Sequence, residues 1–145
     1  MDAGSDTTAI ALTHILWQLS RHPVELQKLR DEIKPVFDEL PEGSFVASYN
    51  SLRNCAYLRA CLDESLRLHP PISTGLQRKT TGSGTKIDGH FIPGDVLVSV
   101  PAYVAHRNEE VFPEPESFIP ERWLQPENAS QFQKNFLAFS AGSRG

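Results

Sequence analysis

The chain has 145 residues, a net charge of −4 and a hydrophobic fraction of 39%, which favours one domain of ordinary size. The negative balance argues against a nucleic-acid partner, since such partners are bound by an excess of Lys and Arg. The sequence contains no apolar run of the ~18 residues that a membrane-spanning helix needs, and no basic start typical of a signal peptide.

The N-terminal half predicts helices. Residues Thr7–Ser20 carry apolar side chains at helical spacing, which predicts a first helix. Pro23 suits the first turn of a second helix, because its missing N–H has no partner to lose there. Pro35 is expected to distort the last turn of that helix or to end it. A third helix is predicted from about residue 54 to residue 68.

The second half of the chain changes character. Residues 86–92 predict a β-hairpin around Asp88-Gly89. Residues 96–100 predict a further strand, and residues 102–106 a short helix. The predicted fold class is therefore mainly α with a small β-sheet (α+β).

A proline-rich segment at residues 111–126 predicts irregular coil. It carries Phe112, Phe118 and Trp123. Long coils of this kind are normally functional or packed on the rest of the chain, here through the aromatic side chains.

Cys55 and Cys61 are the two cysteines, six residues apart in the segment predicted as the third helix. At ~100° per residue they lie on different faces. We therefore expect neither a disulfide nor a two-cysteine metal site, but reduced thiols.

Two short motifs lie on predicted helices. Glu64 and Arg67 are three residues apart and share a helix face; a solvated surface pair is the ordinary alternative. In AGSDTT, Gly4 interrupts a helical pattern, and Asp6 and Thr7 place an acid beside an alcohol, a combination that can relay protons. A simple helix start capped by Asp6 is the other interpretation.

Two further motifs lie in predicted coil. PERW contains Arg122 within a charged pair, and the C-terminal segment FSAGSRG has the pattern F-x-x-G-x-R. Each is weak by itself.

The four motifs in this order resemble the C-terminal half of a cytochrome P-450, and the resemblance is strongest to fungal members. LRLHPP, DGHFIPGD and AHRNEEVFPEPESFIPERW match as well. The resemblance covers essentially all 145 residues and implies one partial domain, running from the oxygen-site helix to the start of the haem-binding loop.

The resemblance implies a role for each motif. Glu64, Arg67 and Arg122 match a buried structural charge triad. Asp6 and Thr7 match the acid–alcohol pair that delivers protons to bound dioxygen.

Other residues take roles around the cofactor, again by resemblance. The implied cofactor contacts are Ala3 and Gly4 beside the oxygen, Arg78 and Arg144 at the haem propionates, and Phe139 and Gly142 in the terminal loop. The implied substrate-pocket residues are Thr74, Gly75 and Leu76.

The implied activity is that of a haem b monooxygenase, which acts on a small hydrophobic substrate and O2 with electrons from a reductase. In the family, a cysteine that ligates the iron follows the pattern F-x-x-G-x-R-x. Here it would follow Gly145, so the chain itself supplies no metal ligand, since Cys55 and Cys61 lie in another helix. We therefore expect the 145 residues alone to be inactive.

The resemblance places the complete protein at the endoplasmic reticulum membrane through an N-terminal anchor. The chain lacks that anchor, so by itself it is expected to be cytoplasmic or of unknown location. Two other functions stay open: a non-catalytic haem-binding protein, and a helical interaction module that docks through the E-x-x-R face and the aromatic coil.

Overall fold

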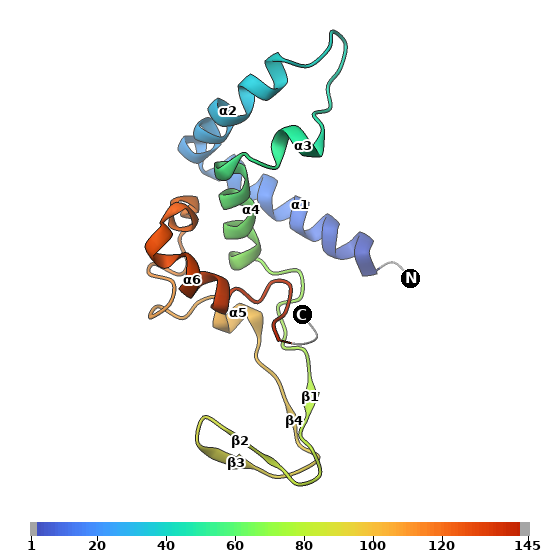
Figure 1. The fold of residues 1–145 in the computed structure, drawn as a ribbon, viewed down its shortest axis with the longest axis vertical. Coiled ribbons are helices and arrows are strands. Elements are labelled where there is room, and N and C mark those ends of the chain that lie inside the picture. Colours follow the sequence, from blue (N-terminus) through green and yellow to red (C-terminus); the bar gives the residue numbers. More distant parts are fainter. Residues whose placement is uncertain (1–2, 143–145) are drawn as a thin grey trace.

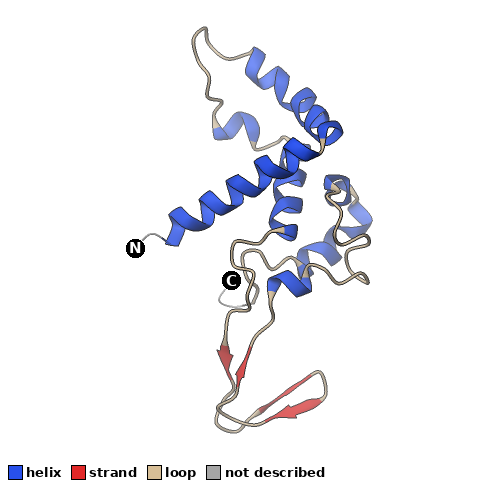
Figure 2. Ribbon diagram, turned by 180° about the vertical axis from the view of Figure 1, so that it is seen from behind, coloured by secondary structure: helices blue, strands red, loops and turns tan. Residues whose placement is uncertain are grey.

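The computed structural model describes residues 3–142 and confirms the predicted α+β class (Figures 1 and 2). Helices make up the N-terminal half, and the strands gather at one end of an elongated molecule. The elements are α1 (Ala3–Arg21), α2 (Pro23–Asp38), α3 (Tyr49–Leu52), α4 (Ala56–Leu68), β1 (Arg78–Lys79), β2 (Thr85–Ile87), β3 (His90–Ile92), β4 (Leu97–Val98), α5 (Ala102–Ala105), the 3-10 helix η1 (Pro120–Leu124) and α6 (Pro126–Asn135).

The three predicted helices are present, and one of the two outcomes expected for Pro35 is excluded. Helix α2 begins at Pro23, as predicted. Pro35 does not end it, because the helix runs on to Asp38. A proline so close to the C-terminus removes one N–H···O bond from the ladder, and the turn after it is still held by Glu39 N–H donating to the Pro35 carbonyl at 3.3 Å.

The predicted hairpin is also present. β2 and β3 pair antiparallel, with Ile87 opposite His90. The two loop residues, Asp88 and Gly89, both have positive φ, at 48° and 77°. This is the backbone of a two-residue turn whose twist matches that of the strands, and Asp-Gly is the sequence that adopts it. The predicted strand over residues 96–100 is shorter, comprising β4 alone, which pairs with β1.

Four elements differ from the sequence expectations, and one of them is the unpredicted strand β1. Helices α3 and α6 were not predicted, and η1 lies inside the segment predicted as coil. Helix α3 is a single turn capped by Ser48, whose Oγ accepts from Ser51 N–H at 3.2 Å. A turn of this length carries too little periodicity for a pattern to detect.

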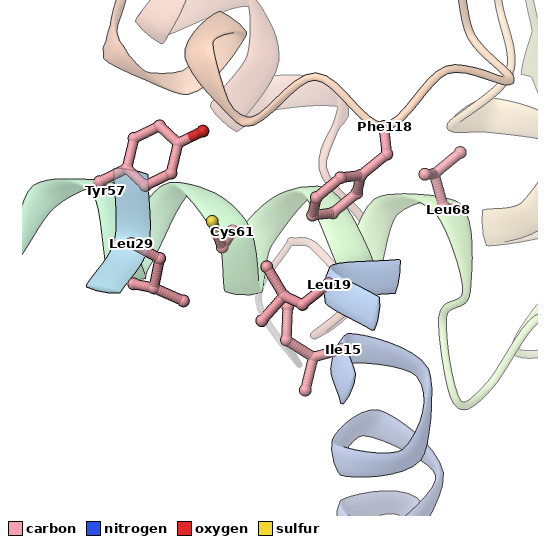
Figure 3. Close-up of a cluster of buried hydrophobic side chains, with 7 residues drawn as sticks. All are labelled: Ile15, Leu19, Leu29, Tyr57, Cys61, Leu68 and Phe118. Carbon is pink, nitrogen blue, oxygen red and sulfur yellow. The ribbon is translucent and has the colours of Figure 1, made fainter. Parts of the chain in front are cut away.

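The main hydrophobic core lies where α1, α2 and α4 meet (Figure 3). Cys61 on α4 is completely buried in it. Its buried members are Ile15, Leu19, Leu29, Tyr57, Cys61, Leu68 and Phe118. Phe118 comes from the proline-rich segment, so this core already joins the two halves of the chain.

A second, aromatic cluster anchors the proline-rich segment to α6. Phe112 is fully buried and stacks on Phe132, with ring centroids 5.1 Å apart. Trp123 packs edge-on against Phe132 and Phe136. The expectation that the coil packs through its aromatic residues is thus confirmed.

One face of α1 remains uncovered in the described residues. Leu12, Leu16 and Trp17 are 55%, 68% and 47% exposed. Over residues 3–142, no helix combines the length and the apolar character needed to cross a bilayer.

Candidate functional site

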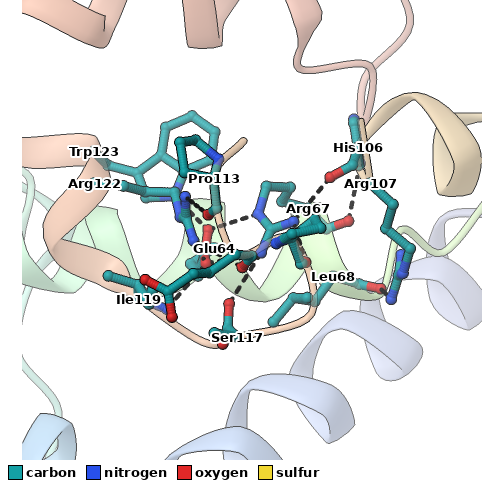
Figure 4. Close-up of polar contacts among 12 residues, drawn as sticks. Glu64, Arg67, Leu68, His106, Arg107, Pro113, Ser117, Ile119, Arg122 and Trp123 are labelled. Atoms are coloured by element: carbon teal, nitrogen blue, oxygen red, sulfur yellow. Dashed lines mark hydrogen bonds and ion pairs between the residues drawn. The ribbon is translucent and has the colours of Figure 1, made fainter. Parts of the chain in front are cut away.

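A buried charge network joins α4 to the segment around η1, and Glu64 is its centre (Figure 4). The Glu64 carboxylate accepts from Arg67 Nε at 2.8 Å and Nη2 at 2.9 Å, and from Arg122 Nε at 3.0 Å. It also accepts from Trp123 Nε1 at 2.9 Å and from the Ile119 N–H at 3.0 Å. The structure therefore brings together the three charged residues that the resemblance grouped.

Arg67 uses all five of its N–H donors. Besides Glu64, its guanidinium donates to the carbonyls of His106 at 2.8 Å, Pro115 at 2.7 Å and Ser117 at 3.1 Å. Because Glu64 and Arg67 are both 0% exposed, each is tolerable only with its partners in place.

Arg122, on η1, likewise combines a bond to Glu64 with bonds to backbone carbonyls. Its Nη1 donates to the Pro113 carbonyl at 2.8 Å, and its side chain is 6% exposed. Within residues 3–142, no buried side-chain nitrogen or oxygen lacks a hydrogen-bond partner. A network satisfied in this way fixes the path of residues 106–122 against α4.

An open cavity of about 1180 Å³ lies beside α1 and α4. Its walls also include the turn after α4, the strand region and the segment after α6. The lining residues are Thr7, Thr8, Ala11, Leu12, Ile15, Leu62, Ser65, Leu66, Pro71, Ile72, Thr74, Leu76, Arg78, Ile87, Asp88, His90, Ile92, Val98, Ser99, Val100, Ala102, Leu137, Ala138, Phe139, Ser140 and Ala141.

Five of the residues singled out from the sequence line this cavity. They are Thr7, Thr74, Leu76, Arg78 and Phe139. They come from three separate segments, namely α1, residues 74–78 and the segment after α6, so only the tertiary fold brings them to one space.

Other predicted residues lie elsewhere. Asp6 is exposed and does not line the cavity. Gly75 and Gly142 also lie outside its lining. Arg144 and the side chain of Ala3 lie outside the part of the chain that the structure describes.

Gly4 does not interrupt the helix, although it stands as a glycine inside the helical pattern of the sequence. Helix α1 is continuous from Ala3, and Thr8 Oγ1 donates to the Gly4 carbonyl at 2.7 Å. A Cβ built on Gly4 would meet nothing within 4 Å. A larger side chain at this position would therefore clash with no neighbour within the described residues. Gly4 also does not line the cavity.

Sequence reasoning missed His90 and Ser99 as cavity residues, and within the segment 137–141 it singled out Phe139 alone. His90 directly follows the Asp-Gly turn, so the predicted hairpin could have drawn attention to it. Leu137 and Ala138 carry no local signal, because they are ordinary apolar residues placed by the end of α6.

The cavity lining is mostly apolar, with Arg78 as its cation within the described part of the chain. The Arg78 Nη1 donates to its own neighbour's carbonyl, Gln77 O, at 3.2 Å, and the side chain is otherwise exposed. Such a space fits a large apolar ligand that carries a carboxylate, since a guanidinium forms charge-assisted bonds with carboxylates.

The two cysteines are free, buried and outside the cavity lining. Burial raises the pKa of the Cys61 thiol to about 12 and raises the pKa of Cys55 above its ordinary value. Both are therefore protonated near neutral pH. Within residues 3–142, no cluster of His, Cys, Asp and Glu could hold a metal ion.

Known proteins resemble this chain over its whole length. The sequence model of the family described as cytochrome P-450 matches residues 1–145. The chain is 40% identical over 143 residues to cytochrome P-450 monooxygenase nodW of Hypoxylon pulicicidum, a match that covers 99% of this chain and 26% of that protein. It is 41% identical over 144 residues to cytochrome P-450 monooxygenase eupD of Phoma sp, covering 98% and 48%.

A third relative carries a more specific name. Tryprostatin B 6-hydroxylase of Aspergillus fumigatus is 38% identical over 140 residues, covering 97% of this chain and 24% of that protein. The chain thus spans about a quarter to a half of the length of these curated relatives.

Proposed function

The chain belongs to the cytochrome P-450 family, and on that premise we propose that it is part of a haem-dependent monooxygenase that acts on a small hydrophobic substrate. Such an enzyme takes electrons from a reductase and incorporates one oxygen atom of O2. The observation that carries the proposal is the apolar cavity, which gathers five residues that the sequence resemblance had assigned to cofactor, oxygen or substrate.

The residues of the cavity fit a haem b. Apolar side chains of α1 and of the strand region would contact the ring, and Arg78 would bind a propionate. When bound, the haem supplies the redox chemistry that activates dioxygen. Thr7 contributes a hydroxyl at the wall formed by α1, where it could hold a proton near the reacting atoms.

We assign Asp6 a less direct role in proton delivery than the resemblance implied. It is exposed on α1, one residue from Thr7. From there it would exchange protons with solvent rather than with the cavity directly.

The thiolate ligand is not contributed by either cysteine of this sequence. Cys55 and Cys61 are buried outside the cavity lining, and their raised pKa values disfavour the thiolate. We therefore propose that the 145 residues by themselves do not catalyse the reaction, and that the iron ligand lies outside them.

The two alternatives make different demands on the same residues. An interaction module that docks through the E-x-x-R face would need those side chains at the surface, whereas Glu64, Arg67 and Arg122 are 0%, 0% and 5% exposed. A non-catalytic haem-binding protein would use the same cavity and is separated only by experiment. The location at the endoplasmic reticulum stays a prediction.

The test is a haem titration of the chain, followed by absorption spectroscopy. Arg78→Gln should weaken haem binding about three- to tenfold, the effect of one exposed charge-assisted contact. Lys79→Gln is the matched control, because Lys79 is the next residue on β1, pairs with Asp95 at 2.8 Å and does not line the cavity. Equal affinities for both variants would exclude Arg78 as a haem contact.

The absorption spectrum of the reduced, CO-bound complex then tests whether the 145 residues alone supply a thiolate ligand. We expect no thiolate-ligated spectrum from these residues alone. Sequencing the transcript across both ends of the reading frame completes the test: a cysteine codon directly after Gly145 supports the monooxygenase, and a stop codon there supports the non-catalytic protein.

A further inference from the structure

His106 is a buried residue for which sequence reasoning assigned no role. It follows α5 and is 0% exposed. Its ring lies between Phe136, with centroids 5.5 Å apart and planes 16° apart, and the edge of Phe112 at 6.3 Å. The imidazole therefore sits in the aromatic cluster, close to where α6 ends.

Both ring nitrogens are used, and their partners determine the tautomer. Nδ1 is 3.0 Å from the Arg67 carbonyl oxygen, which only accepts. Nε2 is 2.7 Å from the Leu137 backbone nitrogen, which only donates. The ring must therefore be neutral, with its proton on Nδ1 and a lone pair on Nε2.

The contact with Leu137 matters because this residue begins a wall of the cavity. Leu137 is the first of five consecutive residues, Leu137–Ala141, that line the cavity. Helix α6 has already ended at Asn135, so no helical ladder holds this segment. Within the described residues, its backbone–backbone hydrogen bonding consists of a turn, in which Ser140 N–H donates to the Leu137 carbonyl at 3.0 Å.

The same imidazole is tied to the charge network. The Arg67 carbonyl that accepts from Nδ1 belongs to the residue whose guanidinium binds Glu64. One side chain thus connects α4 with the cavity wall, through two hydrogen bonds and no intervening residue.

We propose that His106 is a positioning residue, which fixes the cavity-lining segment Leu137–Ala141 to the charge network of α4 through its neutral imidazole. The role of the segment as a cofactor wall rests on the proposed function. The coupling itself does not, because it involves only residues of this chain.

The test is residue-resolved amide hydrogen exchange of the full chain, with two variants that each keep one bond. The side-chain amide of His106→Asn can still donate to the Arg67 carbonyl, but it is too short to reach Leu137. His106→Gln extends to the place of Nε2 and offers a carbonyl oxygen to the Leu137 N–H. His22→Phe is the control, since His22 is a partly buried histidine that is bonded to the Gln18 carbonyl at 2.8 Å and does not line the cavity.

We expect the Leu137 amide to be protected in the wild type. In His106→Asn its exchange should rise about tenfold or more relative to the amides of α4, and in His106→Gln much less. His22→Phe should not change the exchange of residues 137–141 relative to α4. Equal exchange of Leu137 in the Asn and Gln variants, or a uniform rise throughout the chain, would overturn the proposal.

A measurement on the wild type tests the coupling even if both variants fail to fold. As the pH falls toward 4, protonation of Nε2 would replace the acceptor with a donor, so the protection of Leu137 should disappear before that of α4. The charged groups facing the ring are Arg67 and Arg107, which oppose its protonation, and Glu64, which favours it. Two results would contradict the coupling. The first is a Leu137 amide that is unprotected from exchange at neutral pH, and the second is a loss of its protection at the same pH as the amides of α4.

Haem affinity, measured beside hydrogen exchange, distinguishes a failure of this inference from a failure of the proposed function. His106→Asn should weaken haem binding while His22→Phe does not. If the wild type binds no haem but the exchange pattern holds, the proposed function fails and the positioning role stands.

Discussion

Arg67 and His106 each bind the other's backbone with their own side chain. Arg67 Nη1 donates to the His106 carbonyl at 2.8 Å, and His106 Nδ1 donates to the Arg67 carbonyl at 3.0 Å. The residues are 39 positions apart. A reciprocal pair of this kind holds two segments in one relative position, because a shift that breaks one bond also strains the other.

Replacing Glu64 by Gln should be strongly destabilising. The change removes a buried carboxylate and leaves two buried guanidinium groups without a counter-charge, at a cost of about 3–5 kcal/mol in the free energy of unfolding. Urea unfolding followed by circular dichroism measures it. Asp63→Asn is the matched control: its partner Arg59 is 69% exposed, so its loss should cost less than about 1 kcal/mol. Similar losses for the two variants would contradict a network centred on Glu64.

Stability should fall in mild acid because of His106. Burial, as the main cause, lowers the pKa of His106 to about 4, from an ordinary value near 6.5. Below pH 6.5 the unfolded chain takes up a proton that the folded chain refuses, so this contribution is complete above pH 6.5 and is lost progressively down to about pH 4. The expected loss is about 2–3 kcal/mol.

The difference in unfolding free energy between wild type and His106→Gln, measured over this pH range, isolates the contribution of the imidazole. The wild type should lose stability more steeply than the variant. Parallel pH profiles would show that the folded and unfolded states bind protons at position 106 equally.

Gly75→Ala should destabilise the wall of the cavity. A Cβ at this position would lie 2.6 Å from Ser99 Cβ and 2.9 Å from the Val100 carbonyl carbon. The backbone atom cannot rotate away, so the segments before β1 and after β4 must separate, at about 1–3 kcal/mol. Thermal unfolding compares it with Gly4→Ala, where a Cβ meets open space inside a helix and a gain of about 0.5 kcal/mol is expected. Equal effects would contradict the close approach at Gly75.

Cys61 should resist thiol reagents until the protein unfolds. Its side chain is 0% exposed and its pKa is raised to about 12, chiefly by burial, so the reactive thiolate is scarce and inaccessible. A colorimetric thiol assay, with and without denaturant, should detect both cysteines only in denaturant. Rapid labelling of Cys61 in native buffer would show that the core around α4 opens readily.

The sequence by itself determined the features that neighbouring residues encode. The Asp88-Gly89 turn, the start of α2 at Pro23 and the shared helix face of Glu64 and Arg67 each depend on a few consecutive positions. The order of four motifs was enough for the family, and with it for Arg122 as a partner of Glu64.

Only the tertiary structure decided which of these residues meet. Leu137 lies 31 positions from His106, and neither residue carries a local signal for the contact. Asp6 and Thr7 are adjacent in sequence, yet of the two only Thr7 lines the cavity, because successive residues of a helix point about 100° apart. Long-range contacts depend on how helices pack and which side chains fit between them, and this information is distributed over the whole chain rather than held in any motif.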